Sequence, residues 1–263
     1  MTLKFNVVIP ARYGSTRLPG KPLLMLAGKP MIIHVCERAN AAGAEHVIVA
    51  TDDERIFNAV VAKGFSAMMT HVAHQSGTER IAEVARQCHW QPEAIIVNLQ
   101  GDEPLIPVEY IREVAIALAT QQAAGIATLA AKINDIAEIF NPNAVKVVVN
   151  KDQYALYFSR APIPWDRSTF TLAGCQSAPA MPYLRHIGIY AYRVAFLQRY
   201  CAWSSSVLEN IEALEQLRIL WEGESIFIKT VAHTPPAGID TLEDLHRVAK
   251  ILSKTDQINL VSF

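Results

Sequence analysis

The sequence predicts an α/β fold with a mostly parallel sheet flanked by helices and a smaller inserted lobe. Over the first two-thirds of the 263 residues, short β-branched runs alternate with amphipathic stretches, which is the pattern of βαβ units. Aromatic and proline-rich segments follow, and strand and helix patterns then resume toward the carboxyl end. A chain of this length can bury the core of one large domain with a small attached lobe.

The first half of the chain supplies the strands and helices in alternation. Each β-branched run precedes an amphipathic stretch, in the pairs 5–11 with 31–42, 47–51 with 55–62, and 94–99 with 108–119. In 31–42 the apolar residues recur at helical spacing, and Gly43 follows as a carboxyl-terminal cap. Ser76 and Glu79 have the spacing of a capping box, so a helix is predicted to begin there and to offer N–H groups to an anion.

The inserted lobe is predicted over about 155–192, within a single domain that spans 1–263. Its first part is aromatic and proline-rich, and 168–182 is rich in Ser, Ala, Pro and Gly, which is typical of a loop. A strand-like run over 186–192 ends the lobe.

After the lobe, the pattern predicts a helix over 208–222, a strand over 226–231 and a last helix from 242. Thr241 and Asp244 have the spacing of a helix cap. Asp240 is therefore expected at the entrance of that helix.

Composition excludes several classes of protein. A formal net charge of −1 gives no support to nucleic-acid binding, which usually requires a basic domain. No segment approaches the roughly 20 apolar residues of a membrane-spanning helix, and the amino terminus lacks the order of a signal peptide. We therefore expect a soluble, cytoplasmic protein. Its four cysteines are widely separated and are expected to be free thiols: Cys36, Cys88, Cys175 and Cys201.

The densest chemical signal lies at 10–22, between the first strand and the first helix, where open α/β sheets bind ligands. Three cations fall within this segment: Arg12, Arg17 and Lys21. Gly14 and Gly20 allow the backbone to curl around a bulky group. Together these features indicate a polyphosphate site; the alternative is a solvated surface loop.

This loop differs from the two common phosphate-binding motifs. Five residues separate Gly14 from Gly20 where a P-loop has four, and Pro22 stands where a P-loop has a metal-binding hydroxyl. No two of the 12 glycines are two residues apart, as the dinucleotide fingerprint requires. A P-loop ATPase and a Rossmann dehydrogenase are thus disfavoured.

A second signal directly follows the apolar strand that ends near residue 99. Gly101 allows a sharp turn that places Asp102 and Glu103 at the edge of the sheet. Carboxylate oxygens are ligands that Mg²⁺ prefers. An ordinary turn rich in Gly, Asp and Pro remains the alternative for this segment.

Taken together, the motifs resemble those of the 3-deoxy-D-manno-octulosonate (Kdo) cytidylyltransferases, also called CMP-Kdo synthetases. The resemblance covers nearly the whole chain, through the segments 10–22, 74–80, 98–104, 141–147, 158–167, 184–190, 214–218 and 238–244. It implies a Rossmann-like nucleotidyltransferase sheet, a lobe that forms a homodimer, and transfer of CMP from CTP to Kdo for lipopolysaccharide biosynthesis. The alternatives are another acidic sugar, such as 8-amino-Kdo or sialic acid, and a nucleotide-binding regulator without catalysis.

The resemblance also implies a role for individual residues. The nucleotide would be bound by Arg12, Gly14, Ser15, Arg17 and Lys21. Asp102 and Asp240 would hold a Mg²⁺ ion and, with Lys21, carry catalysis. The sugar would be bound by Arg80, Gln100, His186, Tyr190, Glu215 and Gln216.

The chemistry of these sugar contacts is reasonable. Arg80 could pair with the carboxylate of Kdo, and the amide, carboxylate and imidazole groups could pair with its hydroxyls. Glu215 and Gln216 are neighbours on a predicted helix, so we expect at most one to be a strong contact. For His186 the alternative is a half-buried strand histidine bonded to backbone.

Overall fold

The computed structural model describes residues 3–14, 18–171, 174–175 and 182–260. A nine-stranded sheet forms its centre, in the order β13-β7-β12-β6-β1-β4-β5, with β8 paired to β12 and β9 paired to β8. These strands are β1 (Asn6–Ala11), β4 (His46–Thr51), β5 (Ser66–Met69), β6 (Ile95–Asn98), β7 (Ile126–Lys132), β8 (Lys146–Val149), β9 (Ala155–Ser159), β12 (Leu184–Arg193) and β13 (Ile226–Val231). Residues 15–17 of the phosphate-loop prediction, which include Ser15 and Arg17, lie outside the described residues.

The sheet is mostly parallel, as predicted. β1 pairs in parallel with β4 and β6, β4 with β5, and β7 with β13. β12 is antiparallel to both of its main neighbours, β6 and β7. Because β6 and β7 are both antiparallel to β12, they run in the same direction as each other.

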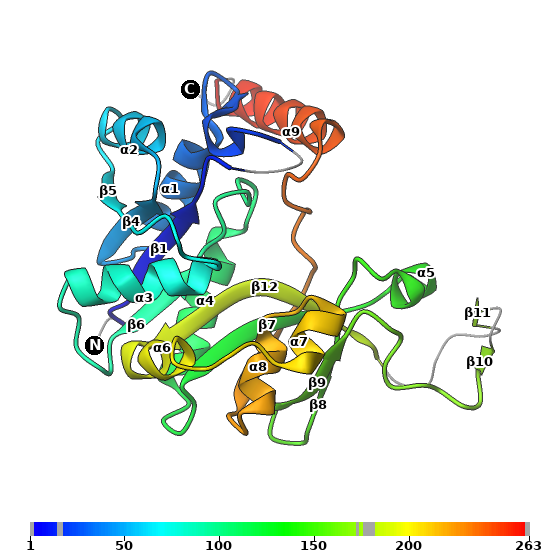
Figure 1. The fold of residues 1–263 in the computed structure, drawn as a ribbon. Coiled ribbons are helices and arrows are strands. Elements are labelled where there is room, and N and C mark those ends of the chain that lie inside the picture. The colour runs from blue at the N-terminus through cyan, green and yellow to red at the C-terminus, as the bar shows by residue number, and fades with distance from the viewer. Residues whose placement is uncertain (1–2, 15–17, 172–173, 176–181, 261–263) are drawn as a thin grey trace.

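Helices cover both faces of the sheet (Figure 1). They are α1 (Met31–Ala41), α2 (Glu54–Val61), α3 (Gly77–Gln87), α4 (Val108–Ala119), α5 (Ile136–Phe140), α6 (Val194–Tyr200), α7 (Val207–Glu212), α8 (Gln216–Trp221) and α9 (Leu242–Leu260). Short elements complete the described chain: a 3₁₀-helix (Lys21–Leu23), β2 (Met25–Leu26), β3 (Lys29–Pro30), β10 (Phe170–Thr171) and β11 (Gly174–Cys175). Among the described residues no helix combines the length and apolar character needed to cross a membrane.

The core explains why the strand sequences read as continuous β-branched runs. Val7 and Ile9 of β1 pack in one cluster with α1, α2 and α4, whereas Val8 packs in a second cluster with α3, α6 and α8. All three are completely buried. A strand covered on both faces needs apolar residues at successive positions rather than at alternate ones.

The prediction of one helix over 208–222 is wrong. α7 ends at Glu212, Ala213 takes a left-handed conformation with φ of 50°, and α8 begins at Gln216. The carbonyl oxygen of Glu212 accepts a hydrogen bond from Arg160 Nε at 2.7 Å, and its carboxylate accepts one from Arg160 N at 2.9 Å. Contacts with Arg160, which directly follows β9, therefore hold the break in place. The segment contains no glycine or proline from which the break could have been predicted.

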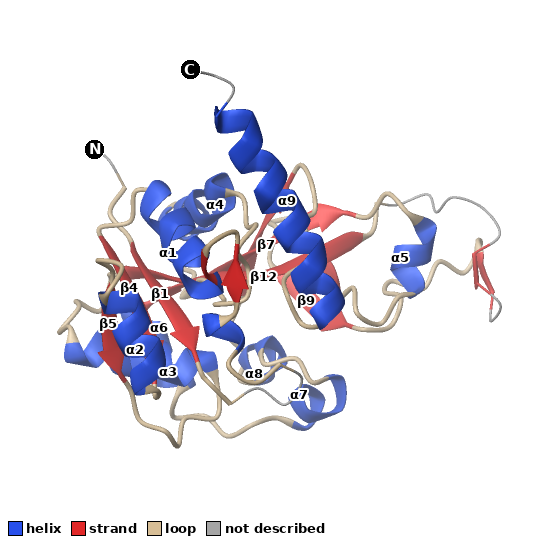
Figure 2. Cartoon of the chain, turned by 90° about the horizontal axis from the view of Figure 1, so that it is seen from above, coloured by secondary structure: helices blue, strands red, loops and turns tan. Residues whose placement is uncertain are grey.

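The structure also locates the segment predicted as an inserted lobe. Its last strand, β12, is paired between β6 and β7 and so belongs to the central sheet. β10 and β11 stand away from the sheet, together with α5, which precedes the predicted range (Figure 1, Figure 2). The range 155–192 thus includes a central strand, and the assembly role of the segment stays a prediction.

Candidate active site

A cavity of about 510 Å³ opens where β1 and β6 end. Parallel strands direct the loops at their carboxyl ends to the same edge of a sheet, which is the usual ligand site of such folds. Ten of the predicted site residues line it: Arg12, Lys21, Arg80, Gln100, Asp102, His186, Tyr190, Glu215, Gln216 and Asp240. Gly14 is described but does not line the cavity.

Lys21 joins the two aspartates that the sequence places far apart. Its Nζ donates to Asp102 Oδ2 at 2.6 Å, to the carbonyl oxygen of Ile239 at 2.7 Å and to Asp240 Oδ1 at 3.2 Å. The Lys21 side chain is mostly buried, whereas that of Asp240 is half-exposed. One cation therefore lies between two carboxylates at the wall of the cavity.

Backbone contacts bring the Asp240 segment to this point. Ile239 N donates to the carbonyl oxygen of Asp102 at 3.0 Å. A Cβ on Gly238 would lie 2.9 Å from that same oxygen, so a residue with a side chain would force the two segments apart. Figure 1 shows the extended segment that leads from the central sheet to α9.

Gly101 likewise allows two segments of the chain to approach closely. A Cβ there would lie 3.1 Å from the carbonyl oxygen of Pro10 and 3.3 Å from Ile32 Cδ1. The requirement is thus a close approach of the segment after β6 to the end of β1. This approach places Asp102 beside the loop that follows β1.

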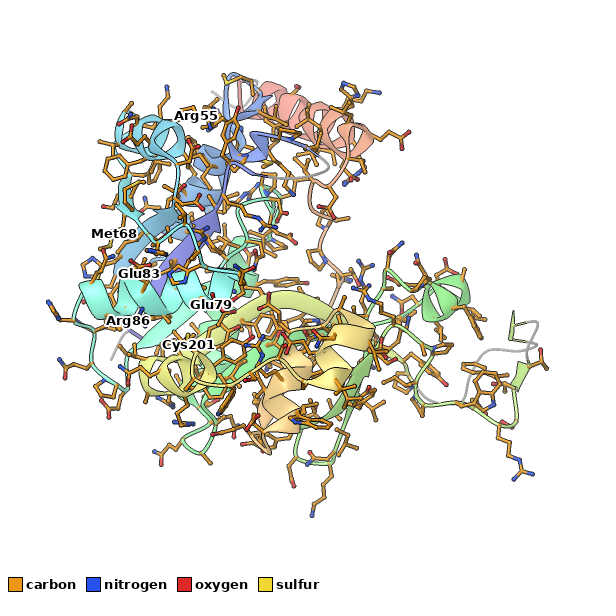
Figure 3. All side chains as sticks on the ribbon, in the orientation of Figure 1. Arg55, Met68, Glu79, Glu83, Arg86 and Cys201 are labelled. Carbon is orange, nitrogen blue, oxygen red and sulfur yellow. The ribbon has the colours of Figure 1, made fainter. Side chains whose placement is uncertain are left out.

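The first part of the phosphate-binding loop is held by α2. The guanidinium of Arg55 stacks over the Tyr13 ring, 3.3 Å from its centroid. Asp53 orients that guanidinium by accepting from its Nε at 3.0 Å and its NH2 at 2.6 Å. Gly20 N closes the loop by donating to the carbonyl oxygen of Tyr13 at 3.0 Å. Figure 3 shows Arg55 beside α2, at the end of the molecule where this loop lies.

Arg80 lies in the cavity wall but is engaged by protein groups. It is 4% exposed, it forms an ion pair with Asp52, and its NH1 donates to Thr70 Oγ1 at 2.8 Å. Ser76 caps its helix by accepting from Glu79 N at 3.2 Å, as predicted. The Glu79 carboxylate accepts a hydrogen bond from Gln75 N at 2.9 Å. In a capping box this carboxylate would accept from the N-cap residue Ser76, so the second bond is shifted by one residue.

His186 contacts other side chains rather than backbone through its ring. Nε2 lies 3.0 Å from Thr128 Oγ1, and the ring packs against Phe158 and Tyr190 with centroids 5.1 and 5.3 Å away. Burial, with a smaller contribution from the charge on Arg185, lowers the pKa of His186 to about 3. The imidazole is therefore neutral at physiological pH.

Glu215 and Gln216 both line the cavity. We expected at most one of them to contact the sugar strongly, because both were placed on one continuous helix. That placement is wrong, since Glu215 directly precedes α8 after the turn at Ala213. Burial raises the pKa of Glu215, whose carboxylate accepts from Thr78 Oγ1 at 3.3 Å. Gln216 is 6% exposed, and its Nε2 has no hydrogen-bond partner among the described residues.

Sequence reasoning missed two tyrosines of the cavity wall. Tyr192 follows Tyr190 by two positions on β12, and their rings stack with centroids 5.8 Å apart. The period of two along a strand was a signal that could have found it. Tyr200 comes from α6, and its buried hydroxyl also lacks a partner within the described part of the chain.

Comparison with known proteins identifies the family. A model described as cytidylyltransferase matches residues 6–226. The chain belongs to the cytidylyltransferase family. It is therefore a nucleotidyltransferase, and the predicted fold class and enzyme class are confirmed.

Individual relatives of this cytidylyltransferase are similar over almost their whole length. It is 56% identical over 255 residues to the 3-deoxy-manno-octulosonate cytidylyltransferases of two Vibrio cholerae serotype O1 strains, M66-2 and ATCC 39315 / El Tor Inaba N16961, covering 97% of this chain and 100% of each relative. A solved structure of CMP:2-keto-3-deoxy-manno-octonic acid synthetase complexed with CTP matches with a TM-score of 0.86 at 46% identity, covering 96% of this chain and 99% of that one.

Proposed function

We propose that this cytidylyltransferase transfers CMP from CTP to the anomeric hydroxyl of Kdo, releasing pyrophosphate and forming CMP-Kdo. The observation that carries the proposal is the convergence of Lys21, Asp102 and Asp240 at the wall of one cavity. The similarity to Kdo cytidylyltransferases over nearly the whole chain supports the choice of nucleotide and sugar.

The nucleotide would bind at the side of the cavity formed by the loop after β1. Arg12 and Lys21 both line this side and supply positive charge. Charge-assisted hydrogen bonds to phosphate oxygens are among the strong contacts that proteins make. Lys21 is bonded to both aspartates in the protein described here, so binding of a triphosphate would require it to exchange a carboxylate for a phosphate oxygen.

The sugar would bind against the neutral hydrogen-bonding groups of the same cavity. Gln100, His186, Tyr190 and Gln216 all line it. The unpaired amide of Gln216 supports this assignment, because a buried donor without a partner costs about 1–3 kcal/mol and a sugar oxygen would satisfy it. Arg80 remains our proposed partner for the sugar carboxylate.

The donor set is compatible with Mg²⁺. Asp102 and Asp240 already surround one cation, the ammonium of Lys21, and both offer hard oxygen ligands. No group of three or more His, Cys, Asp or Glu residues suited to a metal occurs among the described residues. Mg²⁺ commonly binds through one or two carboxylates together with substrate phosphates and water, so the two aspartates would be sufficient protein ligands. When bound, Mg²⁺ would neutralise the α-phosphate and lower the pKa of the attacking hydroxyl.

The protein's own groups would then contribute chiefly by positioning. The cavity wall would hold the sugar hydroxyl in line with the α-phosphorus, and Arg12 and Lys21 would neutralise the charge that develops on the departing pyrophosphate. No covalent bond to the enzyme is needed. The bond from the α-phosphorus to the bridging oxygen breaks as the bond to the sugar oxygen forms, and the proton of the sugar hydroxyl is released to water.

We also propose that the enzyme is a cytoplasmic homodimer whose product serves lipopolysaccharide biosynthesis. Large apolar side chains are exposed on the segment expected to form the dimer, including Leu156 at 59% and Trp165 at 51%. Exposed apolar groups of this size favour contact with another protein surface.

The decisive experiment is a magnesium-dependent assay of pyrophosphate release with CTP and a series of acidic sugars. We expect release with CTP and Kdo, and none without sugar or without divalent metal. Stronger pyrophosphate release with sialic acid or 8-amino-Kdo would show that this other sugar, and not Kdo, is the substrate. Binding of CTP without sugar-dependent release would indicate a non-catalytic regulator.

A further inference from the structure

Thr128 lies where β12 departs from regular pairing with β7. The register between the strands shifts between Ile187 and Tyr190, which produces a bulge. The hydroxyl oxygen of Thr128 lies 2.7 Å from the carbonyl oxygen of Ile189, 3.0 Å from that of Ile187 and 3.0 Å from His186 Nε2. Thr128 is completely buried. One hydroxyl is thus within hydrogen-bond distance of both the bulge carbonyl oxygens and the imidazole.

The single proton of this hydroxyl decides the direction of the bonds. Both carbonyl oxygens can only accept. If Thr128 donated to the histidine, both carbonyl oxygens would face oxygen lone pairs in a buried site, which is unfavourable. The proton is therefore directed to a carbonyl oxygen, and His186 Nε2–H donates to Thr128 Oγ1.

This arrangement determines which nitrogen of His186 is free to bind a ligand. A neutral imidazole carries one ring proton, and burial keeps this ring neutral by lowering the pKa of His186 to about 3. With the proton on Nε2, Nδ1 is an acceptor. Nδ1 has no hydrogen-bond partner within residues 3–14, 18–171, 174–175 and 182–260, and His186 lines the cavity.

We propose that Thr128 is a positioning residue that fixes His186 as its Nε2–H tautomer, so that Nδ1 accepts a hydrogen bond from a hydroxyl of the sugar. The part of this inference that concerns the sugar rests on the proposed function. The tautomer itself depends only on the contacts of Thr128. A neutral acceptor suits a hydroxyl donor and would be repelled by a carboxylate, so the contact also selects which end of an acidic sugar faces His186.

The tautomer can be tested by NMR on the full chain with ¹⁵N-labelled histidine and no substrate. His186→Gln identifies the His186 signals by their loss. We expect the wild-type ring to be protonated at Nε2 and not at Nδ1, and Thr128→Ser to retain this state. In Thr128→Val we expect a mixture of tautomers or the Nδ1–H form. A wild-type ring protonated at Nδ1 would overturn the proposal, whatever the enzyme's substrate.

The consequence for the sugar can be tested by steady-state kinetics. In Thr128→Val the KM for the sugar should rise about tenfold, the effect of losing roughly one good hydrogen bond, while the KM for CTP stays within about twofold. Thr128→Ser should restore the wild-type value. Thr230→Val removes a hydroxyl from the neighbouring strand β13 of the same sheet and should leave both constants unchanged.

Two results would contradict this second step. An unchanged KM for the sugar in a folded Thr128→Val variant would show that the tautomer does not matter for binding. If Thr128→Val fails to fold, a wild-type KM in His186→Gln would lead to the same conclusion. Absence of activity with every acidic sugar in the wild-type enzyme would refute the proposed function alone and leave the NMR result standing.

Discussion

Asp102 makes one hydrogen bond through its side chain and one through its backbone, so its part in catalysis can be separated from its part in folding. Its carboxylate meets Lys21, whereas its carbonyl oxygen receives Ile239 N at 3.0 Å. Substitution of the carboxylate by an amide leaves the second contact in place. The proposed metal site and the local fold can therefore be tested independently.

We predict that Asp102→Asn lowers the rate of pyrophosphate release by at least ~100-fold, because a neutral amide is a poor ligand for Mg²⁺. The temperature of unfolding should change by only a few degrees. Asp152→Asn, at an exposed position after β8, is the matched control and should retain full activity. A rate close to wild type in Asp102→Asn would remove this residue from the catalytic set.

His186 gives a prediction for stability against pH. Its pKa is about 3 in the folded protein against 6.5 for the ordinary side chain, so between these values the unfolded chain binds a proton that the folded chain does not. The free energy of unfolding therefore falls as pH falls, by up to ~1.4 kcal/mol per pH unit from this one group.

His186→Gln should remove this contribution. Between pH 7.5 and 5, we expect its free energy of unfolding in urea to fall by about 2 kcal/mol less than that of the wild type. His246→Gln, on an exposed position of α9, should behave as the wild type. Equal pH dependence in wild type and His186→Gln would show that the imidazole is not held neutral.

Two contacts between secondary-structure elements shape the cavity. α2 holds the phosphate-binding loop through the stacking of Arg55 on Tyr13. The end of β9 holds the break between α7 and α8, because Ser159 and the following Arg160 both contact Glu212. Each contact lies outside the cavity and determines where cavity residues are placed.

Arg55→Ala should raise the KM for CTP by about two- to fivefold, which corresponds to a cation–π contact of ~0.5–1 kcal/mol. Arg55→Lys should not restore it, because an ammonium cannot stack on Tyr13 and pair with both Asp53 oxygens as a planar guanidinium does. Figure 3 shows that Arg86 lies at the far end of α3, so Arg86→Ala should have no effect on this constant. A selective loss of sugar binding in Arg55→Ala would contradict the assignment.

Glu212→Ala should weaken sugar binding although Glu212 does not line the cavity. Its carboxylate accepts from Ser159 Oγ and Arg160 N, and leaving these donors unpaired should destabilise the fold by about 1–3 kcal/mol. The turn that places Glu215 and Gln216 would then be less well defined, and the KM for the sugar should rise more than that for CTP. Glu222→Ala, at the exposed end of α8, is the control; an equal effect in both variants would refute the role of Glu212.

For the whole molecule, the proposed homodimer can be examined with one surface substitution. Leu156 on β9 is 59% exposed, and a charge there would oppose burial in an interface. We expect sedimentation velocity to show a dimer for the wild type and a monomer for Leu156→Asp. Met25→Asp changes a residue of similar exposure on β2 and should remain dimeric. A monomeric wild-type protein would reject the dimer.

The local pattern of apolar residues and chain breakers was sufficient to predict most of the strands and helices. The sequence predicted α4 over 108–119 and β13 over 226–231, which are the bounds observed, because apolar periodicity and chain breakers act over neighbouring residues. It also placed the phosphate-binding loop and Asp102 each directly after a strand of a mostly parallel sheet, where the loops of such folds bind ligands. These features were readable because each depends on a short stretch of chain.

Tertiary contacts decided the rest. The turn at Ala213 is held by Arg160, which directly follows β9. The approach of Asp240 to Lys21 depends on the fit of Gly238 against Asp102, and the tautomer inferred for His186 depends on Thr128 on a neighbouring strand. In each case the determining partner lies many residues away in the chain, so no local pattern records it. Local sequence patterns thus specified a mostly parallel sheet, most of its helices and the residue types at the cavity. Which side chains face one another depended on the folded chain, because hydrogen bonds and steric fit act at contact distance.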